Sequence, residues 1–138
     1  MRLVTFRRTG RLEQRAGVLR EDGGIVDLAA ADRLLEGGLL ALIAAEPALL
    51  ERARALAGHA PAAEDAVLCA PLPRPAKNIF CVGKNYHEHA HEFSKSGFDS
   101  SAAAGAVPKY PIIFSKVPET VVPPSASVVI DPQVSTAV

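Results

Sequence analysis

The chain has 138 residues, 15 of them basic and 15 acidic, so its formal net charge is zero. A balanced charge disfavours binding to the phosphate backbone of a nucleic acid, and we expect no nucleic-acid partner. The longest apolar run, residues 39–45, is far shorter than the roughly 20 residues of a membrane span, so no membrane partner is predicted. Arginines interrupt the start of the chain, which is not typical of a signal peptide, and a cytoplasmic location is predicted.

Short apolar segments open the chain. Residues 2–7 and 16–19 have the composition of strands, and residues 25–28 follow the glycine-rich sequence Glu21-Asp22-Gly23-Gly24. Apolar runs separated by such a turn predict a small antiparallel meander.

Residues 32–57 carry leucines at three- and four-residue spacings, which predicts helices. The Gly37-Gly38 pair weakens the first helix, because glycine is a poor helix former. Pro47 suits the first turn of a second helix, and Gly58 is expected to end it.

Four prolines fall within residues 58–76. Proline fixes its own backbone and disfavours the helical conformation in the residue before it, so this segment is expected to be extended. It is the predicted boundary between two domains, residues 1–70 and 71–138. Beyond it, strands are predicted at residues 78–82, 110–116 and 128–130, with a helix-compatible segment at 86–93 and a loop at 94–107.

The candidate chemistry is concentrated in residues 87–92, which hold three of the four histidines and two glutamates. If this segment is helical, His89 and Glu92 lie at positions i and i+3 on one face. A carboxylate beside an imidazole fixes its tautomer and raises its basicity, which suits a general base that activates water.

Two other interpretations of the histidine cluster stay open. His87 and His91 are four residues apart, a spacing that binds zinc on a helix, and in a strand His87, His89 and His91 would share one face. The segment could equally be a solvated polar helical turn, because histidine and glutamate are ordinary surface residues. Spacing alone does not choose among the three.

A family resemblance covers nearly the whole chain. Residues 79–92 resemble the Val-Gly-x-Asn-Tyr-x-x-His-x-x-Glu signature of the fumarylacetoacetate hydrolase family. Residues 111–116 are similar to its Pro-x-x-Phe-x-Lys strand. Residues 1–28 resemble the small N-terminal domain of many bacterial members, of the type of 2-keto-4-pentenoate hydratase and 2-hydroxyhepta-2,4-diene-1,7-dioate isomerase.

The resemblance implies an α+β fold, with a small N-terminal α/β domain followed by the start of a β-rich roll of mixed sheets. It implies a homodimer that acts on small oxo-acids, such as acylpyruvates or 2-hydroxydienoates, by hydrolysis, isomerisation, decarboxylation or hydration. His89 and Glu92 match the catalytic dyad that activates water or moves a proton. Asn85, Tyr86 and Lys116 match substrate-binding positions.

The resemblance also implies a divalent cation, Mg²⁺ or alternatively Mn²⁺ or Ca²⁺. The family's metal ligands are a Glu-x-Glu pair and a later aspartate, and this chain contains no Glu-x-Glu. We therefore assign no metal ligand within the chain and expect the ligands after Val138. The chain is interpreted as a fragment of a complete enzyme, which on its own neither binds the metal nor turns over substrate and is poorly folded beyond residue 76.

Two alternatives from other classes accompany this interpretation. The chain could be a catalytically inert remnant or interaction module, whose exposed strand edge pairs with a partner. It could also be a zinc-binding protein that uses His87, His89 and His91. Zinc content and the size of the native product are the observations that separate these alternatives.

Overall fold

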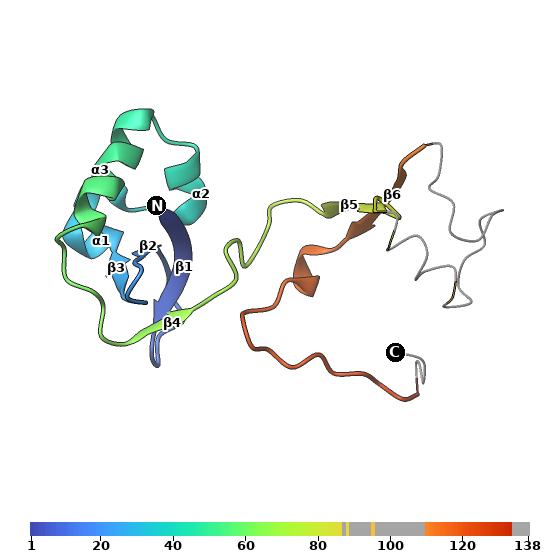
Figure 1. Cartoon of the computed structure of the whole chain (residues 1–138). Coiled ribbons are helices and arrows are strands. Elements are labelled where there is room, and N and C mark those ends of the chain that lie inside the picture. Colours follow the sequence, from blue (N-terminus) through green and yellow to red (C-terminus); the bar gives the residue numbers. More distant parts are fainter. Residues whose placement is uncertain (87, 89–94, 96–109, 134–138) are drawn as a thin grey trace. The chain divides into compact units, whose positions relative to one another are not determined.

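The computed structural model describes residues 1–86, 88, 95 and 110–133, and the chain divides into two compact units (Figure 1). The first unit consists of residues 1–74 with the segment from residue 121 onward, and the second of residues 75–120. Helices and antiparallel strands occur together, which confirms the α+β class. The assignment of domains to residues 1–70 and 71–138 stays a prediction.

A four-stranded antiparallel sheet forms the centre of the first unit, in the order β3-β2-β1-β4 (Figure 1). The predicted meander is confirmed by β1, β2 and β3, and Gly23 takes the positive φ of 85° that the turn before β3 requires. The fourth strand was not predicted, since it lies in the proline-rich segment. The strand bounds are β1 (Arg2–Arg8), β2 (Gln14–Leu19), β3 (Ile25–Asp27) and β4 (Ala66–Leu68).

The helical region is divided into short pieces. Gly37, with a φ of 112°, precedes one of them and separates it from the 3-10 turn before it, as the weakness of the glycine pair suggested. Pro47 opens the longest helix and Gly58 caps its end, both as predicted. The pieces are α1 (Leu28–Ala31), the 3-10 helix η1 (Arg33–Leu35), α2 (Gly38–Ile43) and α3 (Pro47–Ala57).

Aliphatic side chains from the sheet and from every helical piece form one core. Ala16 and Val18 of β2 supply the sheet side of this core, and Leu28, Leu35, Leu39, Leu42 and Ala53 supply the helical side. Phe6 of β1 is fully buried as well, and it packs close to Gly17. A Cβ at position 17 would lie 2.8 Å from Ile25 Cγ2 and 3.0 Å from Phe6 Cδ1, so glycine lets these side chains close over the strand.

Asp27 is the one buried carboxylate among the described residues, and its partners are all in the first unit. Its Oδ2 accepts a hydrogen bond from Arg15 at 2.7 Å and from Arg8 at 3.4 Å, while Oδ1 accepts from the Ala30 N–H at 3.1 Å. Arg8 also pairs with the half-exposed Asp65 at 2.9 Å. One carboxylate thus joins two strands and caps α1, which compensates for its removal from water.

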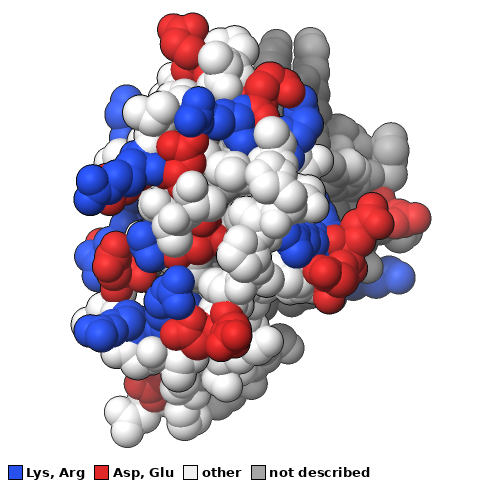
Figure 2. Space-filling model, turned by 90° about the vertical axis from the view of Figure 1, so that its left-hand side faces the viewer, with Lys and Arg blue, Asp and Glu red and all other residues white. Residues whose placement is uncertain are grey.

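Charged side chains of both signs are interspersed on one face of the first unit. In Figure 2, lysines and arginines alternate with aspartates and glutamates over the face in view. In the described part of the chain, no helix combines the length and the hydropathy needed to cross a membrane.

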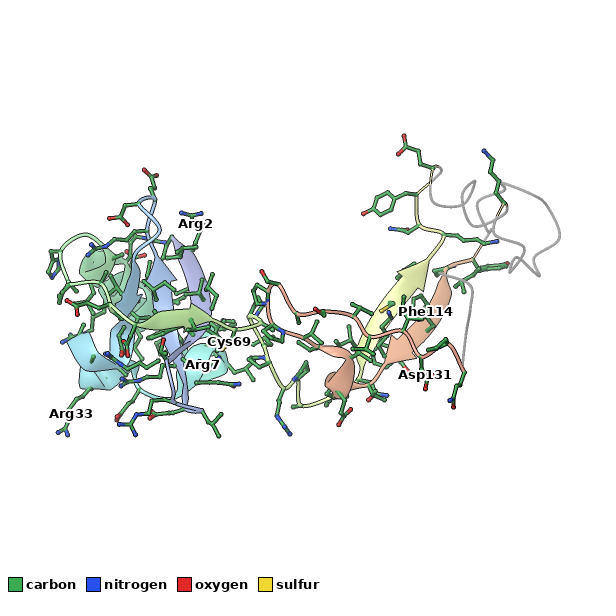
Figure 3. All side chains as sticks on the ribbon, turned by 90° about the horizontal axis from the view of Figure 1, so that it is seen from below. Arg2, Arg7, Arg33, Cys69, Phe114 and Asp131 are labelled. Atoms are coloured by element: carbon green, nitrogen blue, oxygen red, sulfur yellow. The ribbon has the colours of Figure 1, made fainter. Side chains whose placement is uncertain are left out.

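The second unit contains a two-stranded antiparallel ribbon, β5 (Ile79–Gly83) and β6 (Ile112–Lys116), followed by the 3-10 helix η2 (Pro118–Thr120). Both strands were predicted. Apolar side chains project from the ribbon into solvent, with exposed fractions of 76% for Phe80 and 62% for Ile113 (Figure 3, where Phe114 is labelled).

The strand predicted at residues 128–130 is wrong. The structure has no strand there, and Val128 and Val129 are almost fully exposed. Valine and isoleucine favour strands, but a strand needs a neighbour with which to exchange backbone hydrogen bonds. No such neighbour lies beside this segment in the described part of the chain.

Candidate functional site

The turn that follows β5 carries the first residues of the signature. β5 ends at Gly83, and the next residue, Lys84, has a φ of 51° in the left-handed region. Gly83 itself has no positive φ, and a Cβ there would make ordinary contacts at 3.6–3.7 Å. The residue of this turn in the left-handed conformation is therefore the lysine.

Asn85 and Tyr86 follow directly and are both exposed, the tyrosine to 72%. Their amide and phenol groups can each donate and accept hydrogen bonds, which suits the recognition of carboxylate and oxo groups. The structure therefore leaves both side chains accessible to a ligand. Their assignment to substrate binding stays a prediction.

The strand register separates Lys116 from this turn. Gly83 pairs with Ile112 at one end of the ribbon, while Lys116 pairs with Ile79 at the other end. A strand rises about 3.3 Å per residue, so roughly 13 Å of ribbon lies between Ile79 and Gly83. The structure brings Asn85 and Tyr86 together and places Lys116, which is exposed, at the far end. Its predicted substrate contact stays a prediction.

The predicted dyad, His89 and Glu92, lies outside the described residues, and so do His87 and His91 of the zinc alternative. Glu88, which is described, is exposed. The roles of the dyad and of the histidine cluster therefore stay predictions.

The described residues do not provide a cation site of their own. Within residues 1–86, 88, 95 and 110–133, no group of three histidines, cysteines, aspartates or glutamates lies close enough to hold a metal ion. After the turn, the described acidic residues are Glu88, Glu119 and Asp131, which are far apart in sequence and all exposed. The oxygen ligands that Mg²⁺ prefers are not assembled by this part of the chain.

Lys84 is a residue that the sequence analysis did not single out. Its side chain is buried, with an exposed fraction of 5%, whereas Lys77, Lys95 and Lys116 are exposed. Lysine is almost never fully buried unless it is paired, so no sequence pattern would have indicated this burial. The one available signal was its place between a strand-ending glycine and Asn85.

Comparison with known proteins agrees with the sequence signature. Residues 78–138 match the family described as fumarylacetoacetate (FAA) hydrolase C-terminal. Oxaloacetate tautomerase YisK of Bacillus subtilis is 33% identical over 82% of this chain and 41% of its own length. The mitochondrial oxaloacetate tautomerases Fahd2a of Rattus norvegicus and FAHD2A of Homo sapiens are 34% and 35% identical, over 96% of this chain and 40% of their own lengths.

The chain thus spans about 40% of the length of the curated relatives that it matches. The matched region of the family, residues 78–138, contains the whole signature segment and both strands of the ribbon. The similarity to the tautomerases extends beyond this region into the first unit, because it covers 82–96% of the chain.

Proposed function

Because the chain belongs to the fumarylacetoacetate hydrolase family, we propose that its protein is a divalent-metal-dependent enzyme that interconverts tautomers of a small oxo-acid. One observation carries the proposal: relatives named oxaloacetate tautomerases are similar along nearly the whole chain. Oxaloacetate is accordingly the first substrate to test. Hydrolysis, decarboxylation and hydration of related oxo-acids are the other reactions that the family resemblance implied.

Tautomerisation needs a group that moves a proton between carbon and oxygen. In the keto form a base removes a proton from C3, and a proton is then delivered to the oxo oxygen to give the enol, so no atom is gained or lost. Histidine suits this transfer because its ordinary pKa lies near neutrality. We assign the base to His89, with Glu92 orienting its imidazole and balancing its charge.

The other predicted contacts concern binding. Asn85 and Tyr86, exposed beside the end of β5, are proposed to donate hydrogen bonds to the carboxylate and oxo groups of the substrate. Lys116 is proposed to add positive charge near the substrate. A bound Mg²⁺, Mn²⁺ or Ca²⁺ would act as a Lewis acid on the oxo group. The described residues do not fit such an ion. On the family resemblance, its Glu-x-Glu ligands are proposed to lie after Val138.

The finer architecture is also a proposal. We infer that residues 1–70 form a small N-terminal α/β domain and that β5 and β6 begin the β-rich mixed-sheet roll of residues 71–138 and beyond. The protein is proposed to form a homodimer in the cytoplasm. The vertebrate relatives are named as mitochondrial, so fractionation of the native cell is the measurement that checks the location.

The test uses the natural gene product, supplied with Mg²⁺, and follows the ultraviolet absorbance of enol-oxaloacetate. His89→Ala should lower kcat by about two to four orders of magnitude, the usual contribution of a general base. His59→Ala is the matched control, because His59 is exposed in the first unit and should leave kcat unchanged. An unchanged kcat in His89→Ala would remove this residue from the proposed role.

One observation favours the interaction-module alternative. The ribbon exposes large apolar side chains on both faces, including Phe80, Ile113 and Phe114, and such patches mark surfaces that another chain or segment covers. Sedimentation of the natural gene product checks this alternative. A natural gene product that stays soluble only in complex with a partner, and that shows no turnover with Mg²⁺ and oxaloacetate, would support it over the enzyme.

A further inference from the structure

Lys84 combines burial with a backbone conformation that is unfavourable for a residue with a side chain. In the described part of residues 75–120 it is the one buried residue, although apolar side chains around it are exposed. Removing an ammonium group from water is costly unless it meets an opposite charge or hydrogen-bond acceptors. The position therefore calls for a functional or structural reason.

The backbone makes the same point independently. A φ of 51° is readily adopted by glycine, and asparagine and aspartate tolerate it, but it is strained for lysine. Glycine at this position would form the turn without strain. The presence of lysine indicates that its side chain has a use that outweighs the strain, and strain of this kind concentrates at binding and catalytic sites.

The location of Lys84 indicates the function of its side chain. Lys84 lies between the end of β5 and Asn85, at the ribbon end opposite Lys116. On the premise of the proposed function, we propose that Lys84 is a further substrate-binding residue, whose ammonium group neutralises a carboxylate of a dicarboxylic oxo-acid. The contact adds specificity for substrates with two carboxylates.

Ammonium chemistry suits this role. Lysine presents a compact charge with three N–H donors, and charge-assisted hydrogen bonds to a carboxylate are about twice as strong as neutral ones. Lys84 already takes part in an interaction within the protein. Three donors allow a ligand carboxylate to be bound in addition to a protein partner.

The first measurement is binding without catalysis. Calorimetry on the natural gene product compares succinate, a four-carbon dicarboxylate, with butyrate, its monocarboxylate counterpart. Lys84→Met keeps the unbranched side chain without its terminal ammonium group, so it should weaken succinate binding roughly tenfold to hundredfold, as expected for a charged hydrogen bond. Butyrate binding should change much less. Lys77→Met, at an exposed lysine before β5, is the control.

A second pair of variants separates the side chain from the backbone. Lys84→Gly relieves the positive φ and removes the ammonium group, so we expect an unchanged or higher Tm together with the same loss of succinate affinity. Lys84→Arg keeps the charge and should retain most of the affinity. If Lys84→Gly binds succinate like the wild type, or if its Tm and affinity fall together, the side chain is structural and the proposal is overturned.

Oxaloacetate turnover then distinguishes this inference from the proposed function. Lys84→Met should raise KM for oxaloacetate more than it lowers kcat, whereas His89→Ala lowers kcat. Succinate binding that is insensitive to Lys84→Met would overturn the role of Lys84 and leave the role of His89 intact. A His89→Ala protein with full turnover would overturn the proposed base and leave the Lys84 binding result unaffected.

Discussion

The two units distribute their apolar and charged side chains in opposite ways. In residues 1–74 of the first unit, Phe6 and the aliphatic core residues are buried. In the second, Phe80, Val82 and Ile113 are exposed, and the buried residue is Lys84. The first arrangement is a closed core, whereas the second resembles part of a larger sheet.

The difference follows from how many layers each sheet has. The four-stranded sheet has helices packed on it, and those helices come from the same 74 residues. In the ribbon, Phe80 and Val82 lie on one face, and Ile79 and Cys81 lie on the other, so both faces are apolar. Strands of this kind occur where layers cover both faces of a sheet, and an isolated two-stranded ribbon is marginally stable in water.

The largest expected effect contrasts one phenylalanine in each unit. Phe6→Ala should lower the free energy of unfolding of the 138-residue chain by about 3–5 kcal/mol, because it leaves a cavity in a closed core. Phe80→Ala should change it by less than about 1 kcal/mol, since the ring is exposed. Urea unfolding followed by circular dichroism measures both. Equal losses of unfolding free energy in the two variants would mean that Phe80 is buried in the folded chain. The contrast between the two units would then be wrong.

A smaller effect is expected for the polar interior of the first unit. Asp27→Ala removes the hydrogen bonds from Arg8 and Arg15 and the cap of α1, so it should destabilise the chain by about 2–3 kcal/mol. The control is Asp65→Ala, whose half-exposed pair with Arg8 should contribute less than about 1 kcal/mol. If Asp27→Ala destabilises the chain no more than Asp65→Ala does, the buried hydrogen bonds of Asp27 do not stabilise the fold.

The smallest effect is a pH dependence confined to the first unit. The hydrogen bond from Arg52 and the N–H of Leu34, 3.0 Å from Oδ1, lower the pKa of Asp32. The Asp32 carboxylate is therefore protonated less readily in the folded state than in the unfolded state. Its contribution to the stability of the fold is complete above the ordinary carboxyl pKa. It is lost as the pH falls through the lowered folded value.

Asp32→Asn tests this dependence, because asparagine can still accept the Leu34 N–H but does not titrate. Acid titration of stability should show a slightly steeper loss for the wild type than for Asp32→Asn in the range below about pH 4. Spectroscopic signals from the β5–β6 ribbon should show the same pH dependence in the wild type and in Asp32→Asn. Parallel stability curves would show that the Arg52 hydrogen bond has no net effect.

Local sequence signals predicted much of the first unit. The glycine turn before β3, Pro47 at the start of α3 and Gly58 at its end act through backbone geometry that a few neighbouring residues determine. β4 was missed because its three residues have no alternating pattern, and pairing with β1, some 60 residues earlier in the chain, forms the strand. Such long-range pairing leaves little trace in local sequence.

The candidate site was less predictable for the same reason. The family resemblance identified Asn85 and Tyr86, and local composition identified the histidine cluster, but neither gave information on which side chains are buried. The left-handed conformation of Lys84 has no local signal either, because glycine, asparagine and aspartate are the residues that usually adopt it. The separation of Lys116 from Asn85 depends on strand register, which the printed sequence does not reveal.

The position of β4 beside β1 has a consequence for synthesis on the ribosome. The strand order β3-β2-β1-β4 leaves one side of β1 open until residues 66–68 have left the exit tunnel. From then on the first sheet can close without any later residue, because its helices already precede β4. Residues 1–74, which contain the whole sheet and its helices, can therefore fold during translation while the strands of the ribbon are still being made.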